Sequence, residues 1–357
     1  MQRSCFRLWS SLERVIAVLT AVLTSAWSIT PAVAQEEQEG KSKPAYVTFQ
    51  LPPNQGIYNM FVNKNLSVTG TYYRSTFGQA AFVRDSHGTI TEIKPQGSQA
   101  TIVAGISADG TIAGWYFQPP TNHGFLRDPK GTITTLDVGI STIVYGISPT
   151  GSIVGTQPSQ AFVRDAKGTV TIFNVAGSIG TLPSSINQSE EIAGIWFDVS
   201  SKSHGFVRSP QGTITSFDPA PGVTGFNTLP SINRDGVVVG SYFTGSYITG
   251  YVLHSFVRSP RGAITLIDIP DAPGTTQANG INDSGTIVGS YAGHHGFVRS
   301  PDGTITSFDV PGAVNTMANG INNAGAVTGT YLTFPSFTSS GFLRLPAGFE
   351  SESEGDH

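Results

Sequence analysis

The feature that most constrains the fold is a long repeated motif. GFVRSPQGTITSFD, which starts at Gly205, returns as GFVRSPDGTITSFD at Gly296. The Phe of this motif occurs seven times, at spacings of 37 to 50 residues with a mean of about 43. Self-similarity at such a period indicates one supersecondary unit repeated along the chain. The seven positions are Phe82, Phe125, Phe162, Phe206, Phe256, Phe297 and Phe342.

Each repeat holds four short runs rich in Val, Ile, Thr, Phe and Tyr. In one unit these runs cover residues 276–282, 285–291, 295–300 and 304–311, and Gly, Pro, Asn or Asp stand between them. Such runs are typical of strands joined by tight turns, and none shows a helical period. Four strands in about 43 residues are typical of a propeller blade. We call them the first to fourth strands of a unit.

The two ends of the repeat region complement each other. Residues 45–51 align with a fourth strand, whereas residues 341–345 form a third strand with no fourth strand after it. Pairing these segments would complete the last sheet and leave no open seam, which an open β-solenoid would have no reason to provide. The fold class we predict is therefore all-β, a seven-bladed propeller of four-stranded blades that the N-terminal strand closes by joining the last blade.

The repeat also resembles a known family. The His-x-Phe motif at residues 204–206 and 295–297, together with GINDSGTIVG from Gly280, is similar to the HAF-repeat family of extracellular repeat proteins. The resemblance covers nearly all of the repeat region. It implies secretion and repeated β structure, and it brings no catalytic residues. The middle letter of the motif varies here among Gly, Ser and Ala.

The N-terminus indicates export. Arg3 and Arg7 precede an apolar run over 15–27, and an Ala-x-Ala site ends at Ala34, which predicts a signal peptide cleaved there. We therefore expect a secreted or periplasmic protein with no membrane span. The predicted domains are a signal peptide (1–34), a disordered linker (35–44), the propeller (45–346) and an acidic disordered tail (347–357).

Composition excludes several classes of protein. The leader holds the single Cys5, so the mature chain has no cysteine and no disulfide. The leader also carries three of the 20 basic and one of the 24 acidic residues, and its removal leaves a net charge of −6. We expect no nucleic-acid partner because there is no basic excess. We also expect a monomer without a cofactor.

Four histidines are predicted to face aspartates across a hairpin. Counting outward from the turn at Gly303 places His295 opposite Asp309, and every His at this position has Asp opposite it. The two hairpins without the His carry Ala80 with Lys94 and Gln160 with Asn174 instead. We interpret the pairs as structural, because four copies in four sectors cannot converge on one substrate. The pairs are His123 with Asp137, His204 with Asp218, His254 with Asp268, and His295 with Asp309.

An arginine follows each motif Phe by two residues. This ring of seven Arg residues is consistent with binding an anionic polymer, but hydrogen bonds to neighbouring turns and carbonyls are the interpretation we favour. The residues are Arg84, Arg127, Arg164, Arg208, Arg258, Arg299 and Arg344.

No catalytic set emerges from the remaining polar residues. Five acidic residues lie outside the leader, tails, turns and His pairs, and no two of them have a spacing that indicates cooperation. We therefore assign no catalytic residue and no metal ligand; no Cys pair, HExxH or complete calcium loop is present. The five acids are Glu92, Glu190, Glu191, Asp198 and Asp271.

Departures from the repeat mark the candidate binding surface. Three connections are unusually long, at 219–230, 243–253 and 332–340, and all belong to one face of a propeller. We predict Phe226, Tyr247, Tyr251 and His294 as ligand-binding residues at the mouth of the channel, with a purely local packing role as the alternative.

Two function classes remain open, with a third beside them. The hypothesis we favour is a secreted, non-enzymatic binding or scaffold propeller whose partner is unknown and is an extracellular glycan, a cell-envelope polymer or a protein. The alternative is a carbohydrate-active enzyme, a polysaccharide lyase or glycosidase, that would use Glu191, Asp198, Asp271 or His294 at the channel mouth. The third is a structural protein of the cell envelope.

Overall fold

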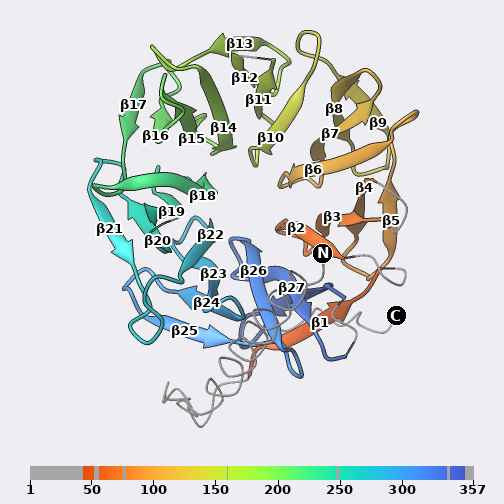
Figure 1. Cartoon of the computed structure of the whole chain (residues 1–357). Helices are drawn as coiled ribbons and strands as arrows, with labels where there is room; N and C mark the ends of the chain where they lie inside the picture. The colour runs from red at the N-terminus through yellow and green to blue at the C-terminus, as the bar shows by residue number, and fades with distance from the viewer. Residues whose placement is uncertain are drawn as a thin grey trace, which may run out of the picture. The chain divides into compact units, whose positions relative to one another are not determined.

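The computed structural model describes residues 43–51, 56–74, 78–158, 160–246, 248, 250–335 and 338–349. They form seven four-stranded antiparallel sheets arranged as blades around a central channel (Figure 1). The predicted signal peptide, most of the predicted linker and the end of the tail lie outside the described residues. The fold is thus the all-β, seven-bladed propeller predicted from the repeat.

The blades follow one order from the channel outward. The first strands, next to the channel, are β2 (Ile57–Val62), β6 (Ala100–Ile106), β10 (Ile143–Ile147), β14 (Gly180–Ile186), β18 (Val223–Ile232), β22 (Gln277–Ile281) and β26 (Asn315–Ile321). The second strands are β3 (Val68–Tyr73), β7 (Ile112–Gln118), β11 (Ile153–Gln157), β15 (Ile192–Phe197), β19 (Val238–Ser246), β23 (Ile287–Tyr291) and β27 (Val327–Leu332).

The two outer strands complete each blade. The third strands are β4 (Gln79–Arg84), β8 (Thr121–Arg127), β12 (Gln160–Arg164), β16 (Ser203–Arg208), β20 (Gly250–Arg258), β24 (His295–Arg299) and β28 (Ser340–Leu345). The fourth strands are β5 (Ile90–Ile93), β9 (Ile133–Leu136), β13 (Val170–Phe173), β17 (Ile214–Phe217), β21 (Ile264–Ile267), β25 (Ile305–Phe308) and, in the seventh blade, β1 (Ala45–Phe49).

The ring closes where the sequence predicts. β1 pairs antiparallel with β28, from Ala45 opposite Leu345 to Phe49 opposite Gly341. The Phe49 ring also reaches the first blade, where its centroid lies 5.9 Å from that of Phe82. Phe49 therefore belongs to the last blade through the pairing of β1 and contacts the first blade through its ring.

A buried Phe and a Gly build the interior of every blade. The seven motif Phe rings are at most 1% exposed, and each packs against a Gly of the second strand. At Gly289 an added Cβ would lie 2.0 Å from the Gln277 carbonyl oxygen and 2.7 Å from the Phe297 ring. The Gly of the second motif is therefore required because the ring occupies the space of a side chain.

Arginine side chains fasten neighbouring blades together. The Arg258 guanidinium lies 5.1 Å from the centre of the Phe217 ring, which belongs to the fourth strand of the preceding blade, and its Nη1 donates to Ser259 O. Arg84, Arg208 and Arg344 stack in the same way on Phe49, Phe173 and Phe308. These contacts support a structural role for the ring of arginines.

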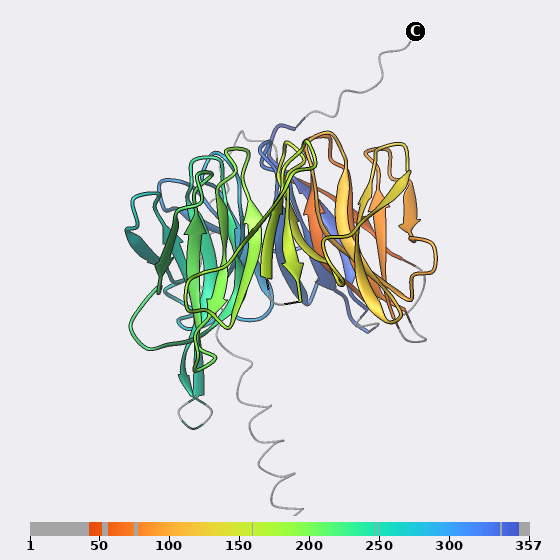
Figure 2. The same cartoon turned by 90° about the horizontal axis from the view of Figure 1, so that it is seen from above.

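The strand connections form two faces. We call the face with the first-to-second and third-to-fourth connections the turn face, and the opposite one, with the second-to-third and fourth-to-first connections, the loop face. Seen from the side, the β19–β20 hairpin extends beyond the other strands on one face (Figure 2). These two long strands pair from Val238 with Arg258 as far as Ser246 with Gly250.

Replacing Phe49 by Ala tests the closure. We expect the free energy of unfolding to fall by about 2 kcal/mol, because a partly buried ring at the seam is lost. Chemical denaturation monitored by circular dichroism measures it. Thr48→Ala, at an exposed position of the same strand, is the control. Equal effects of the two substitutions would contradict the role of Phe49 in the seam.

Gly289→Ala tests the contact between Gly and Phe. We expect a loss of about 1–3 kcal/mol, because the added methyl group overlaps a carbonyl and a buried ring. Gly225→Ala is the matched control, since its nearest neighbour would be Ser203 Oγ at 3.9 Å. Thermal denaturation compares the two variants, and equal melting temperatures would refute the packing argument.

Candidate functional site

The central channel contains a cavity of about 690 Å³, within the range typical of small-ligand sites. All seven first strands contribute to its wall. Among the residues that the structure describes, the lining contains no Asp, Glu, Lys, Arg or His. Its polar groups are amides and hydroxyls, so the channel is a neutral site.

Bulges in the first strands turn polar side chains toward this cavity. The register of β2, β22 and β26 shifts at Asn59, Asn279 and Asn319, and all three line the cavity. A bulge re-aims one side chain relative to its neighbours. Asn279 Nδ2 donates to Ala318 O at 2.7 Å, and Gln277 Nε2 donates to Asn279 Oδ1 at 3.0 Å. Amides from three adjacent blades thus share one side of the channel.

Two aromatic residues line the channel as well. Tyr145 occupies the bulge of β10, and Trp115 comes from β7. Burial raises the pKa of the Tyr145 hydroxyl, although a hydrogen bond with Thr156 opposes the shift. The hydroxyl therefore remains protonated and neutral. Aromatic faces combined with amides suit ligands that carry both hydroxyl groups and apolar ring faces.

The structure brings each predicted His against its Asp. The Nδ1 atoms of His123, His204 and His295 lie 3.0, 2.8 and 2.8 Å from an oxygen of Asp137, Asp218 and Asp309. His254 Nδ1 lies farther from Asp268, at 3.5 Å, and makes no hydrogen bond. The pairs lie in four different blades, near the loop face.

Each of these histidines also contacts an aromatic ring of the second strand. The ring centroids of His204 and Trp196 are 4.5 Å apart with an interplanar angle of 24°. The corresponding partners of His123, His254 and His295 are Tyr116, Tyr242 and Tyr291, at 5.2 to 5.4 Å. Each imidazole therefore lies between an aromatic ring of the second strand and the carboxylate that follows the fourth strand. This packing accounts for the His–Asp pair as a structural contact within the blade.

The fourth blade departs from this pattern because its His meets a second carboxylate. His204 Nε2 lies 3.5 Å from Asp198 Oδ2, while Lys202 Nζ lies 3.8 Å from Asp218 Oδ2. Backbone hydrogen bonds, first from Lys202, lower the pKa of Asp198. Asp198 is therefore ionised beside the imidazole at neutral pH.

The predicted ligand-binding residues have different surroundings. Phe226 is half-buried, and its ring lies 6.4 and 6.1 Å from those of Phe217 and Phe256, so it contributes to packing between blades. Tyr251 is 59% exposed on the β19–β20 hairpin, and His294 is exposed next to His295. No ring contact joins these three residues among those that the structure describes. Tyr247 lies outside the described residues.

The acidic candidates do not form a common site. Glu92 pairs with Arg74, Glu190 accepts a hydrogen bond from Ser152, and Glu191 accepts one from Asn187. Each of these carboxylates, like Asp198, thus has its own partner. In the described part of the chain, no group of three His, Cys, Asp or Glu side chains is placed to hold a metal ion.

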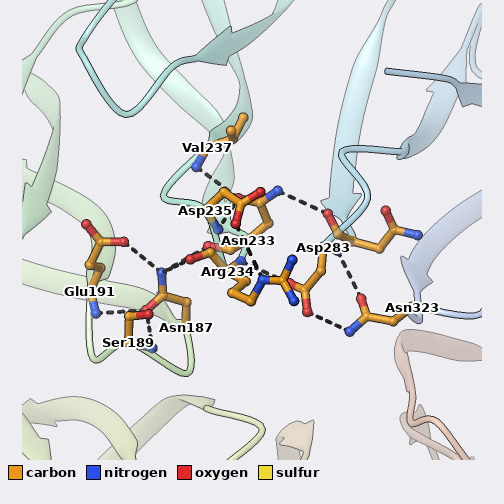
Figure 3. A network of polar contacts seen from close by, with 10 residues as sticks. Asn187, Ser189, Glu191, Asn233, Arg234, Asp235, Val237, Asp283 and Asn323 are labelled. Carbon is orange, nitrogen blue, oxygen red and sulfur yellow. Dashed lines mark hydrogen bonds and ion pairs between the residues drawn. The ribbon is translucent and has the colours of Figure 1, made fainter. Parts of the chain in front are cut away.

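Sequence reasoning missed a series of amide bridges on the turn face. Asn187 Nδ2 donates to Asn233 O in the next blade at 2.9 Å, and Arg234 N donates to Asp283 Oδ1 at the following interface (Figure 3). Asn233, Asn282 and Asn322 make the same bridge to Asn282, Asn322 and Asn63. The Ile-Asn pair that recurs at the end of the first strand was the available signal in the sequence.

The comparisons with known proteins concern the fold. No family model and no curated protein matches the chain. A catalytically inactive virginiamycin B lyase from Staphylococcus aureus, solved with quinupristin, is 16% identical over 85% of this chain and 100% of its own, with a TM-score of 0.58. A streptogramin B lyase is 17% identical over 84% and 97%, with a TM-score of 0.57.

A third solved structure is the β-propeller domain of the Trilobed protease from Pyrococcus furiosus. It is 9% identical over 84% of this chain and 99% of its own, with a TM-score of 0.54. At these identities the likeness establishes the propeller class and nothing about activity. The described residues include no helix long and apolar enough to cross a membrane.

Asp309→Ala tests the His–Asp pair. We expect a loss of only about 0.5–1 kcal/mol, because the two side chains are 33% and 45% exposed and water screens their interaction. Asp309→Asn keeps a side-chain oxygen as an acceptor, so it should lower the free energy of unfolding by less than Asp309→Ala does. Thermal denaturation at neutral pH compares them, and a loss of ligand binding without any change in melting would overturn the structural interpretation.

Proposed function

We propose that the protein is an exported binding module whose channel takes a neutral ligand rich in hydroxyl groups, such as a segment of a glycan. The observation that carries this proposal is the neutral, amide-rich lining of the 690 Å³ cavity. Export rests on the predicted signal peptide with cleavage after Ala34.

The channel supplies the contacts that such a ligand needs. Each Asn side chain offers a donor and an acceptor, so it can bond a hydroxyl group in either direction. Tyr145 and Trp115 provide aromatic surface for the apolar face of a sugar ring. An anionic ligand would find no cation in the lining. The chemistry therefore favours neutral over charged polymers.

A carbohydrate-active enzyme, in particular a lyase, is the second candidate. Its support is the His204 imidazole, which has a carboxylate at each ring nitrogen and is the one such arrangement among the described histidines. A carboxylate that orients a His is one element of general base catalysis. A virginiamycin B lyase and a streptogramin B lyase among the structural neighbours support a propeller as a scaffold for lyase chemistry, although neither name refers to a carbohydrate.

A binding screen separates the two candidates. The mature chain is tested against neutral and anionic oligosaccharides by calorimetry, and product release is followed in the same samples. We expect binding of a neutral oligosaccharide without products, and roughly tenfold weaker binding by Asn319→Ala or Tyr145→Leu, since each removes about one hydrogen bond or ring contact.

Thr215→Ala, at an exposed position of β17, is the control and should bind like the unmodified protein. Binding that survives both channel substitutions would contradict the channel site. Product formation that His204→Ala abolishes would instead favour the enzyme.

A further inference from the structure

A second cavity lies outside the channel, between the third and fourth blades on the turn face. Its volume is about 430 Å³, and its wall includes Ser152, Asp165, Lys167, Glu190 and Arg208. In contrast to the neutral channel, this lining contains two carboxylates and two cations. Nothing in the proposed function uses these residues.

The cavity occurs where the amide bridges between blades are interrupted. In the third blade, Ser148 stands at the position of the bridging Asn, and its hydroxyl remains within its own turn, 2.9 Å from Thr150 Oγ1. Across this interface Ser152 Oγ donates instead to Glu190 Oε1 at 2.5 Å.

Glu190 departs from the repeat at a backbone cost. The corresponding turn position is Gly in five blades, namely Gly110, Gly151, Gly236, Gly285 and Gly325, each with a positive φ, and in the first blade it is Leu66, which also has a positive φ. Glu190 has a φ of 63°, in the left-handed region that residues with a side chain adopt less readily than Gly. Glu190 thus places a carboxylate at the cavity in a backbone conformation that Gly adopts more readily.

The four charged groups are not paired with one another. Within the part of the chain that the structure describes, Asp165, Lys167, Glu190 and Arg208 make no ion pair within 4.0 Å. Arg208 is 8% exposed, and its Nε lacks a partner, although the same is true of Nε in Arg258 and Arg344. Arg208 differs from Arg258 and Arg344 because it lines this open cavity together with the carboxylates of Asp165 and Glu190.

We infer that this cavity binds a zwitterion of the α-amino acid type, either a free amino acid or a short peptide with free ends. Glu190 and Asp165 receive the ammonium group, and Arg208 and Lys167 receive the carboxylate. The balanced charge of the lining matches a ligand that carries both signs, whereas a simple anion or cation would leave two like charges facing it. The volume falls within the range of small-ligand sites.

Glu190→Gly provides the sharpest test because it introduces the residue that five other blades carry at this position. Gly relieves the positive φ but removes the hydrogen bond from Ser152, so we expect a nearly unchanged melting temperature together with at least tenfold weaker binding. Glu191→Gln, one residue away and outside the cavity lining, is the matched control and should leave binding unchanged.

Calorimetry of the mature protein with free amino acids and glycyl dipeptides measures the binding. The N-acetylated and esterified forms of each binding compound, which lack one of the two charges, should bind at least tenfold more weakly. Lys167→Ala should weaken binding while leaving the fold intact, because its side chain has no ion-pair partner to lose. The absence of zwitterion binding, equal binding of the blocked forms, or full binding by Glu190→Gly would each overturn the inference.

Discussion

Every blade depends on burying its two faces against two neighbours, and this requirement governs the whole molecule. A four-stranded sheet of Val, Ile, Phe and Tyr has no core of its own, so its buried residues belong to clusters shared with adjacent blades. Ala193 of the fourth blade, for example, packs with Val238 and Phe256 of the fifth. A row of such sheets would leave an apolar face at each end. Closing the ring through β1 removes both faces at once, which explains why one blade is assembled from the two ends of the propeller.

Much of this architecture follows from the sequence because it repeats. The spacing of the motif Phe predicted seven blades, and the complementary segments 45–51 and 341–345 predicted the seam. Hairpin register followed from the turn glycines, so the sequence alone predicted that His295 lies opposite Asp309. Each of these predictions used either a short local pattern, such as a turn, or the regular spacing of the repeats. Seven copies of one pattern also reduce the chance that a single misread turn alters the result.

The candidate sites were harder to predict because their residues depart from the pattern that the blades share. The channel amides reach the cavity through bulges, and a bulge at Asn279 or Asn319 cannot be recognised from strand alternation alone. Phe226 was predicted as a ligand contact because its connection is long, but β18 is extended by the same residues and the ring packs inside. Glu190 stands where five blades have Gly, whereas Arg208, at the end of β16 in the same blade, was interpreted as one member of a uniform ring.

The amide bridges have a direction that bears on the mechanics of the ring. Each bridging Asn reaches forward to the backbone of the following blade, and this series runs from the fourth blade through the seventh to the first. On the turn face this arc is bridged by side-chain amides, whereas Ser107 and Ser148 stand at the bridging position in the second and third blades. Stiffness is therefore distributed unevenly around the circle. Slow local opening, which exposes backbone amides to solvent, should therefore be concentrated in the blades that lack the amide bridges. The bridged blades should open together less often, so the ring is stiffer on one side than on the other.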